Sequence, residues 1–160
     1  MSLNKKKLLE KIIEKLEEDL ALFAKAARAS HLEATHEQNK AENKYDTRGL
    51  EAAYLAGGQA RKVQEVEQSL EKFQMLNPGD FTGKGADVGA LVSVDMAGDI
   101  GWFFIGPCHG GLEVLFSKKE VTVLTPESPL GSLLIGRKAG EFVMFGNGRS
   151  VATYKIKELL

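Results

Sequence analysis

Apolar residues recur every three or four positions over the first part of the chain. The members of this series are Leu9, Ile13, Leu16, Leu20, Phe23 and Ala27. Glu and Lys fill most of the positions between them, so only one stripe of the helix is apolar. This arrangement is typical of a long helix that buries a narrow seam on a partner helix. The spacing predicts a helix over residues 4–34.

A second helical pattern follows a polar stretch over residues 33–44, where we expect the chain to reverse. Its apolar members are Leu50, Ala53, Ala60, Val63, Val66, Leu70 and Phe73. The pattern stops at Asn77-Pro78-Gly79, because proline and glycine together end a helix. Two long helices joined by a short polar turn predict an antiparallel hairpin. Small residues between Ala52 and Ala60 should let the helices approach closely, although Gly57-Gly58 weakens the second helix by about 1 kcal/mol per glycine.

The second half of the chain changes to short apolar runs separated by turn residues. All four prolines lie in this half, together with most of the 17 glycines. The expected strands are 89–95, 101–105, 111–116, 121–125, 141–145 and 151–159. Residues 130–138 should form a short helix or a turn. The pattern therefore predicts a small, strongly bent antiparallel sheet that is covered on one face.

Composition limits the classes of function that remain. The 160 residues include 21 Lys and Arg against 22 Asp and Glu, a balance that does not favour a strongly basic nucleic-acid binder. A single cysteine excludes an internal disulfide framework and a cysteine-based zinc site, and it fits a reducing, cytoplasmic location. No apolar run approaches about 20 residues, so we expect no membrane association. The charged N-terminus does not resemble a signal peptide, and Lys5-Lys6-Lys7 should be a solvated helix start.

Two groups of motifs resemble a known family. Residues 128–143, SPLGSLLIGRKAGEFV, resemble the C-terminal signature of the Gre transcription elongation factors. The turn Gly146-Asn147-Gly148 and the strand start Tyr154-Lys155-Ile156 follow in the family's order. In the first half, Glu42-Asn43 followed by Tyr45 is similar to the family's tip signature, shortened by one residue. Residues 57–61 lie where the family's second helix has small and basic residues.

The resemblance implies an α+β fold with two domains. Residues 1–77 would form an antiparallel coiled-coil arm, and residues 78–160 an FKBP-like β-rich domain. The implied partner is bacterial RNA polymerase, whose secondary channel the arm enters to reach nascent RNA in backtracked complexes. The chain would bind no cofactor by itself and would share Mg²⁺ with the polymerase active centre. It would not be an enzyme, because the polymerase itself hydrolyses the RNA.

The resemblance also assigns the acidic tip of the arm. Glu42 matches the family's tip glutamate and would be the metal ligand that acts in catalysis. The family's second acid, three residues earlier, is replaced by Asn39, and a neutral amide is a poorer Mg²⁺ ligand than a carboxylate. Glu37 lies nearby and could substitute for it. The sequence therefore predicts weak stimulation of cleavage, or a non-cleaving regulator or inhibitor that occupies the channel.

Polymerase docking should centre on residues 125–131, just before the family's most specific stretch. Two prolines stiffen this loop, and the alternative is that they only shape it. The candidate docking residues are Pro126, Glu127, Ser128, Pro129 and Gly131.

Basic residues on the second helix are weaker candidates for RNA contact. Arg48, Arg61 and Lys62 could touch the RNA backbone, although a solvated charged face is the simpler interpretation. Two other classes of protein stay open. One is a coiled-coil adaptor. The other is a peptidyl-prolyl isomerase, for which the sequence shows no evident aromatic pocket.

Overall fold

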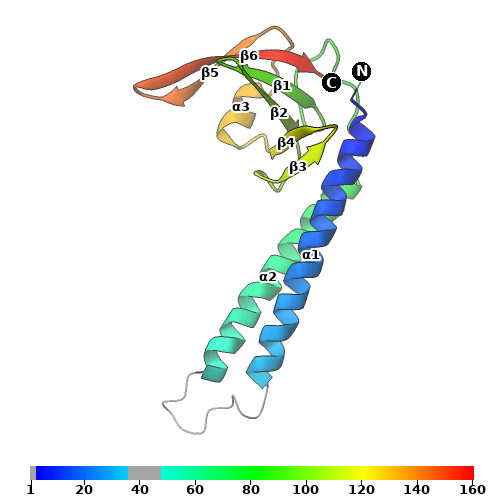
Figure 1. The fold of residues 1–160 in the computed structure, drawn as a ribbon, viewed down its shortest axis with the longest axis vertical. Helices are drawn as coiled ribbons and strands as arrows, with labels where there is room; N and C mark the ends of the chain where they lie inside the picture. The colour runs from blue at the N-terminus through cyan, green and yellow to red at the C-terminus, as the bar shows by residue number, and fades with distance from the viewer. Residues whose placement is uncertain (1–2, 36–47) are drawn as a thin grey trace. The chain divides into compact units, whose positions relative to one another are not determined.

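The chain folds into two long helices followed by a β-sheet with one short helix (Figure 1). The structure is a computed structural model that describes residues 3–35 and 48–160, apart from the side chains of 30, 31, 33–35 and 48–56. This arrangement confirms the predicted α+β fold class, with a helical part that precedes a β-rich part. None of the described helices is long and apolar enough to cross a membrane.

The two long helices lie within a residue or two of their predicted bounds. Helix α1 spans Lys5–Thr35 and α2 spans Arg48–Gln74. Asn4 begins α1, since its side-chain oxygen accepts the N–H groups of Lys6 and Lys7 at 3.1 and 3.3 Å. The two helices run side by side in opposite directions, as the hairpin prediction requires (Figure 1).

Six strands form one mixed sheet. Their bounds are Leu91–Met96 (β1), Asp99–Ile105 (β2), Glu113–Phe116 (β3), Lys119–Leu124 (β4), Phe142–Asn147 (β5) and Ser150–Leu159 (β6). The strand order is β3-β4-β2-β1-β6-β5. Every neighbouring pair is antiparallel except β2 and β4, which pair in parallel from Trp102↔Val121 to Ile105↔Leu124. The prediction of an all-antiparallel sheet was therefore wrong at this pair, because β3 intervenes in the chain and returns β4 in the direction of β2.

Helix α3, Pro129–Leu134, covers one face of the sheet and confirms the short helix predicted there. Leu130 and Leu134 pack into a buried cluster with side chains from four strands. The buried strand members are Val92, Val94, Ile105, Val143, Ile156 and Leu159. This cluster is the core of the β-rich part.

The helix bases pack with the sheet. One compact unit comprises Met1–Ile13 and Lys72–Leu160, and the other comprises Glu14–Glu71. The predicted division between residues 77 and 78 follows the change from helix to strand, whereas the packing groups both helix bases with the strands. Leu8 and Ile12 are fully buried here, although the predicted seam omitted them.

Phe73, at the base of α2, is fully buried, and with Phe104 it is one of the two largest fully buried side chains of the described residues. Its ring lies against the chain just after β2, where a Cβ added at Gly106 would come within 2.9 Å of the Phe73 Cζ and of Val123. Glycine at this position is therefore what lets the Phe73 ring reach the sheet.

Lys5 fixes the start of α1 to the loop that precedes β1. Its Nζ donates to the carbonyl oxygens of Pro78 and Gly89 at 3.0 and 3.1 Å and lies 4.8 Å from the Phe81 ring centroid. Burial lowers the pKa of Lys5, while the charge of Asp80 acts in the opposite direction. Lys5 is thus half-buried and bonds the start of α1 to this loop, which corrects the expectation of a solvated lysine at this helix start.

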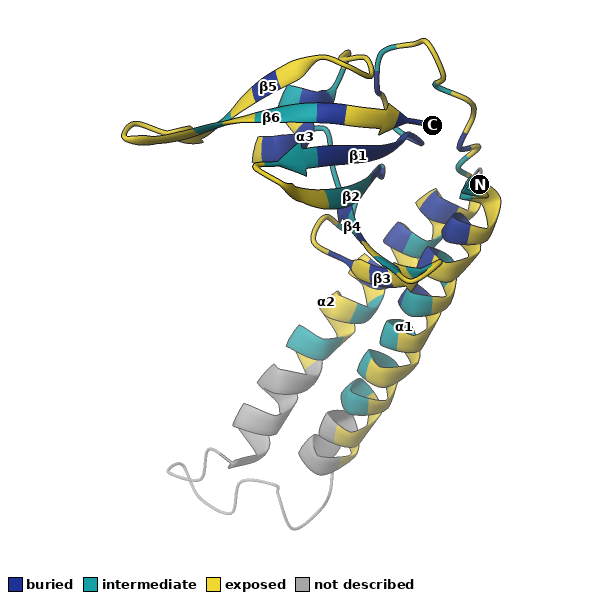
Figure 2. Ribbon diagram, turned by 45° about the horizontal axis from the view of Figure 1, so that its top comes forward, coloured by how far each residue is buried: buried dark blue, intermediate teal, exposed yellow. Residues whose placement is uncertain are grey.

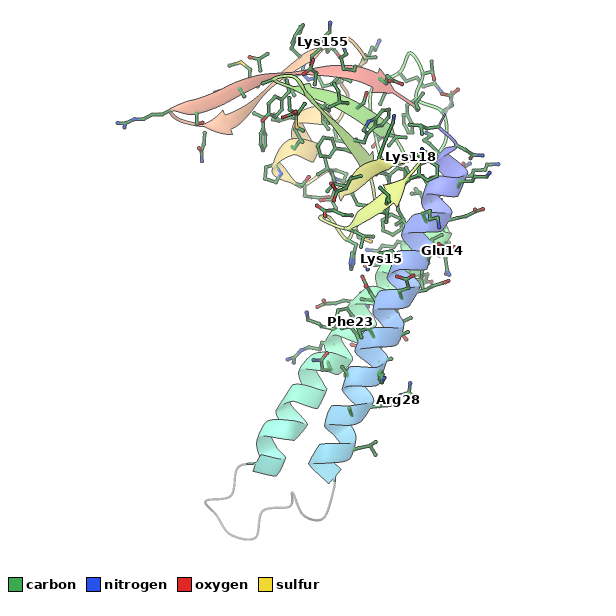
Figure 3. All side chains as sticks on the ribbon, viewed as in Figure 1. Glu14, Lys15, Phe23, Arg28, Lys118 and Lys155 are labelled. Atoms are coloured by element: carbon green, nitrogen blue, oxygen red, sulfur yellow. The ribbon has the colours of Figure 1, made fainter. Side chains whose placement is uncertain are left out.

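The hairpin does not show the predicted close approach at the glycine pair, which lies in the first half of α2. A Cβ built at Gly57 or Gly58 meets nothing within 4 Å, so neither glycine is needed for packing. The contacts between helices come from larger groups: the Lys62 Nζ lies 5.2 Å from the ring centroid of Phe23, which is labelled in Figure 3. Leu16 and Val66 are also buried in this unit.

Gly57→Ala should therefore stabilise the protein by about 0.5–1 kcal/mol, because alanine lowers the backbone entropy of the unfolded chain and fits an open helix surface. Urea unfolding measures the change. Gly106→Ala is the matched control and should destabilise the protein, because the new methyl group would collide with Phe73. A loss of stability with Gly57→Ala would show that the glycine pair packs closely after all.

Candidate functional site

The predicted docking segment forms a tight, internally bonded turn before α3. Ser128 is the N-cap of α3: its Oγ accepts the N–H of Gly131 at 3.1 Å and donates to the carbonyl oxygen of Thr125 at 2.7 Å. Pro129 occupies the first helical turn, where its missing N–H leaves no bond unmade. The turn is therefore held by the residues of the motif itself.

Gly131 is buried at the inner side of this turn. A Cβ at this position would come within 2.0 Å of the Thr125 carbonyl oxygen and 2.5 Å of the Ser128 Oγ. The close approach of the helix to the capping loop requires glycine here. Gly131 is thus a shaping residue, and its lack of a side chain leaves it nothing to offer a partner.

The side chains that remain available for a partner are those of Glu127 and Pro129. Both are exposed, whereas Pro126 and Ser128 are partly buried. The structure thus separates the five predicted docking residues into two that face solvent and three that build the turn. A carboxylate beside a rigid proline ring on a fixed turn can form one charge-assisted bond and one apolar contact with a partner.

The predicted RNA contacts are only partly visible. Arg61 is exposed on α2, and Lys62 places its ammonium group over Phe23 of α1. A cation above an aromatic ring contributes about 0.5–1 kcal/mol at exposed sites. Lys62 therefore has a contact within the arm. The side chain of Arg48 lies outside the described residues, and contact of these three residues with RNA stays a prediction.

The predicted acidic tip also lies outside the described residues. Glu37, Asn39 and Glu42 fall between the described ends of α1 and α2. Their assignment to Mg²⁺ stays a prediction that rests on the sequence resemblance.

A groove on the sheet bears on the isomerase alternative. It has a volume of about 560 Å³ and is lined by Trp102 and Phe103 together with two Glu and two Lys side chains. The Lys119 Nζ lies 4.7 Å from the Trp102 ring centroid and occupies one face of that ring. This charged, open groove does not favour the burial of an apolar proline ring.

One signal that the sequence interpretation missed is the capping role of Ser128. A serine directly before a proline and an apolar run is a helix start signal.

Comparison with known proteins gives a curated relative and several similar solved structures. No family model matches the sequence. The transcription elongation factor GreA of Thermomicrobium roseum is 28% identical over 100 residues, which are 62% of this chain and 58% of that protein. The chain thus matches 58% of the length of this relative.

Solved structures of Gfh1 proteins are also similar to this chain. Gfh1 of Thermus aquaticus is 16% identical, with 96% of this chain and 92% of that chain covered and a TM-score of 0.37. The GreA factor homolog 1 (Gfh1) of Thermus thermophilus is 16% identical, with 92% and 94% covered and a TM-score of 0.35. The match to GreA confirms the resemblance of this chain to the Gre transcription elongation factor family that its motifs predicted.

Proposed function

We propose that the chain is a transcription elongation factor of Gre type that binds bacterial RNA polymerase at its secondary channel and acts on backtracked complexes. The observation that carries the proposal is the 28% identity with GreA over 100 residues. The architecture supports it, since helices of 31 and 27 residues are about 45 and 40 Å long and form a reaching arm.

The proposed chemistry belongs to the polymerase. RNA hydrolysis by a pair of metal ions needs oxygen ligands that hold the more weakly bound Mg²⁺. Glu42 at the end of the arm would add one carboxylate to those that the polymerase supplies. The chain itself would then modulate the reaction without being an enzyme.

A second candidate function is a regulator that occupies the channel without promoting cleavage. Asn39 favours this candidate, because it leaves one tip carboxylate where the family pattern has two. The two candidates share the partner and differ only in what the tip does to Mg²⁺. The rate of RNA cleavage in a stalled, backtracked elongation complex distinguishes the two candidate functions.

Docking is expected to depend on Glu127 and Pro129, the two exposed members of the capped turn. Glu127→Lys should weaken binding to core polymerase at least about tenfold, because it reverses a charge at the contact without touching the Ser128 bonds. Binding of the full chain to surface-immobilised polymerase measures the change in affinity. The full chain is used because the helix bases belong to the same compact unit as the sheet, so deletion of residues 1–76 would expose the surface that they cover.

Control variants at Glu113 and Ser128 make the docking test specific. Glu113→Lys changes the same charge at an exposed position of β3 and should leave affinity unchanged. Ser128→Ala should lower the free energy of unfolding by about 1 kcal/mol through loss of the cap, while Ser128→Thr, which keeps the hydroxyl that donates to Thr125, should retain most of that stability. Unchanged affinity with both Glu127→Lys and Pro129→Ala would place the docking surface elsewhere.

At the tip, native protein should promote cleavage slowly or only at high Mg²⁺, because a single carboxylate holds the ion weakly. Asn39→Asp should raise the cleavage rate, and Glu42→Gln should abolish it. The rate of release of the RNA 3′ fragment from a backtracked complex measures both effects, and polymerase affinity should stay within about twofold in each variant.

The outcome of the tip experiment also tests Glu37. Fast cleavage by native protein at low Mg²⁺ that is lost with Glu37→Gln would show that Glu37 completes the site. Failure of Asn39→Asp to promote any cleavage, with polymerase binding intact, would exclude the cleavage role and leave the channel occupant.

A further inference from the structure

We propose that a cavity between the first turn of α1 and the sheet binds a nucleoside phosphate. The cavity has a volume of about 380 Å³ and lies on the face of the sheet that is turned away from α3. Clefts that bind small molecules have volumes of about 300–1,000 Å³, so a single nucleotide fits this one. Binding at this cavity would be a property of the chain alone and does not depend on the proposed function.

The strand register shows which side chains form the floor of the cavity. Val92 and Val94 belong to the core beneath α3, so Ser93 between them faces the other side of the sheet. Trp102 and Glu158 are the register partners of Ser93 on β2 and β6, and they therefore lie on that same side. These two side chains line one part of the cavity.

The end of the β3–β4 hairpin supplies the rest of the floor. Trp102 pairs in parallel with Val121 of β4, so Lys119, two residues earlier, lies on the same side of the sheet as Trp102. Phe116 is opposite Lys119 in the β3–β4 ladder and shares that side. The turn of this hairpin, where Lys118 is labelled, lies beside the first turns of α1 (Figure 3). The floor therefore combines two aromatic rings with an ammonium group.

The start of α1 forms the opposite wall. Its buried positions, Leu8 and Ile12 among them, contrast with exposed positions on the outer side of the helix (Figure 2). Leu3, Asn4 and Lys7 line the cavity from this wall. The Asn4 side chain already accepts two N–H groups of the first turn. The group that this wall offers to an anion is therefore the Lys7 ammonium group and not the helix end itself.

Three charged groups line the cavity without neutralising one another. Within the described part of the chain, none of Lys7, Lys119 and Glu158 forms an ion pair. The Lys119 Nζ instead lies 4.7 Å from the Trp102 ring centroid. Two ammonium groups against one carboxylate leave one net positive charge at the cavity. Such a site attracts an anion, and a lysine ammonium group binds phosphate as a point charge.

The aromatic rings favour a ligand that has a planar ring besides its charge. Lys119 covers one face of Trp102, whereas no ring or cation contact occupies Phe116 among the described residues. Any nucleobase can stack on such a ring, because every base has a π face. Glu158 can accept a sugar hydroxyl, as carboxylates in nucleotide sites do. A phosphate, a sugar hydroxyl and an aromatic ring together describe a nucleoside phosphate.

Fluorescence of Trp102 measures binding directly, because the chain has one tryptophan and it lines the cavity. The full chain is titrated with ADP in the absence of Mg²⁺, which would neutralise the phosphates, and a parallel titration of free tryptophan corrects for absorption by the nucleotide. We expect a saturable change below about 1 mM ADP. Pyrophosphate and adenosine carry the two halves of ADP, and each should bind at least about tenfold more weakly because it makes only part of the contacts.

Lys7→Glu should weaken ADP binding at least about tenfold, because it replaces one of the two ammonium groups by a carboxylate. Lys6→Glu is the matched control: Lys6 is the exposed neighbour in the same run of lysines and does not line this cavity, so affinity should stay within about twofold. Trp102 and Lys119 also line the groove on the sheet, whereas Lys7 does not, so this pair of variants shows which of the two spaces ADP occupies. Thermal unfolding shows that each variant is folded.

Phe116→Leu tests the stacking ring. Leucine keeps an apolar side chain at the end of β3 and removes only the π face. ADP should therefore bind about fivefold to tenfold more weakly to this variant, while its affinity for pyrophosphate stays unchanged.

Three results would overturn the proposal. One is the lack of any saturable change with ADP up to about 10 mM. Another is a loss of ADP binding with Lys6→Glu as large as that with Lys7→Glu, which would reduce the effect to general surface charge. The third is equal affinity for ADP and pyrophosphate in both the native chain and Phe116→Leu, which would leave a simple anion site that does not recognise the nucleoside.

Discussion

The packing of Phe73 against the sheet is the contact on which the β-rich part of the chain depends. Its ring is fully buried, and it reaches the strands only because Gly106 has no side chain. Burial of one aromatic side chain contributes a few kcal/mol, a large share of the stability of a small domain. Leu8 and Ile12 of α1 are buried in the same unit, so both helices begin or end inside the body that contains the sheet.

The residues that stabilise the fold differ from those that remain available to a partner. The capped turn before α3 uses Ser128 and Gly131 for its own geometry and leaves Glu127 and Pro129 at the surface. In the same way, Lys5 bonds to two backbone carbonyls, so it is a structural residue despite its place in a run of three lysines. A charged or polar residue in a motif can thus belong to the framework, and only its contacts show which role it has.

The sequence predicted what depends on local periodicity. The seam through Leu16 and Phe23 predicted α1 to within a residue at each end, since spacing along a helix needs no knowledge of the partner. The burial of Leu8 and Ile12 and the parallel pairing of β2 with β4 were not predictable in this way, because both depend on which distant segments meet. Gly57-Gly58 illustrates the same limit: small residues permit a close approach, but open space surrounds them here. For the candidate site, the motif identified the turn, and only the structure separated its exposed residues from its buried ones.

The central claim is that the end of the arm reaches the polymerase active centre. The single cysteine makes a direct measurement simple, because Cys108→Ser removes it and Glu42→Cys then gives one attachment point for an iron chelate. Hydroxyl radicals generated at this chelate cut the chains next to the attachment point, because they react before they diffuse far. The account predicts cuts in the 3′ end of the nascent RNA and in the polymerase segments that hold the catalytic Mg²⁺. Cuts confined to the outer surface of the polymerase, with the chain bound, would contradict it.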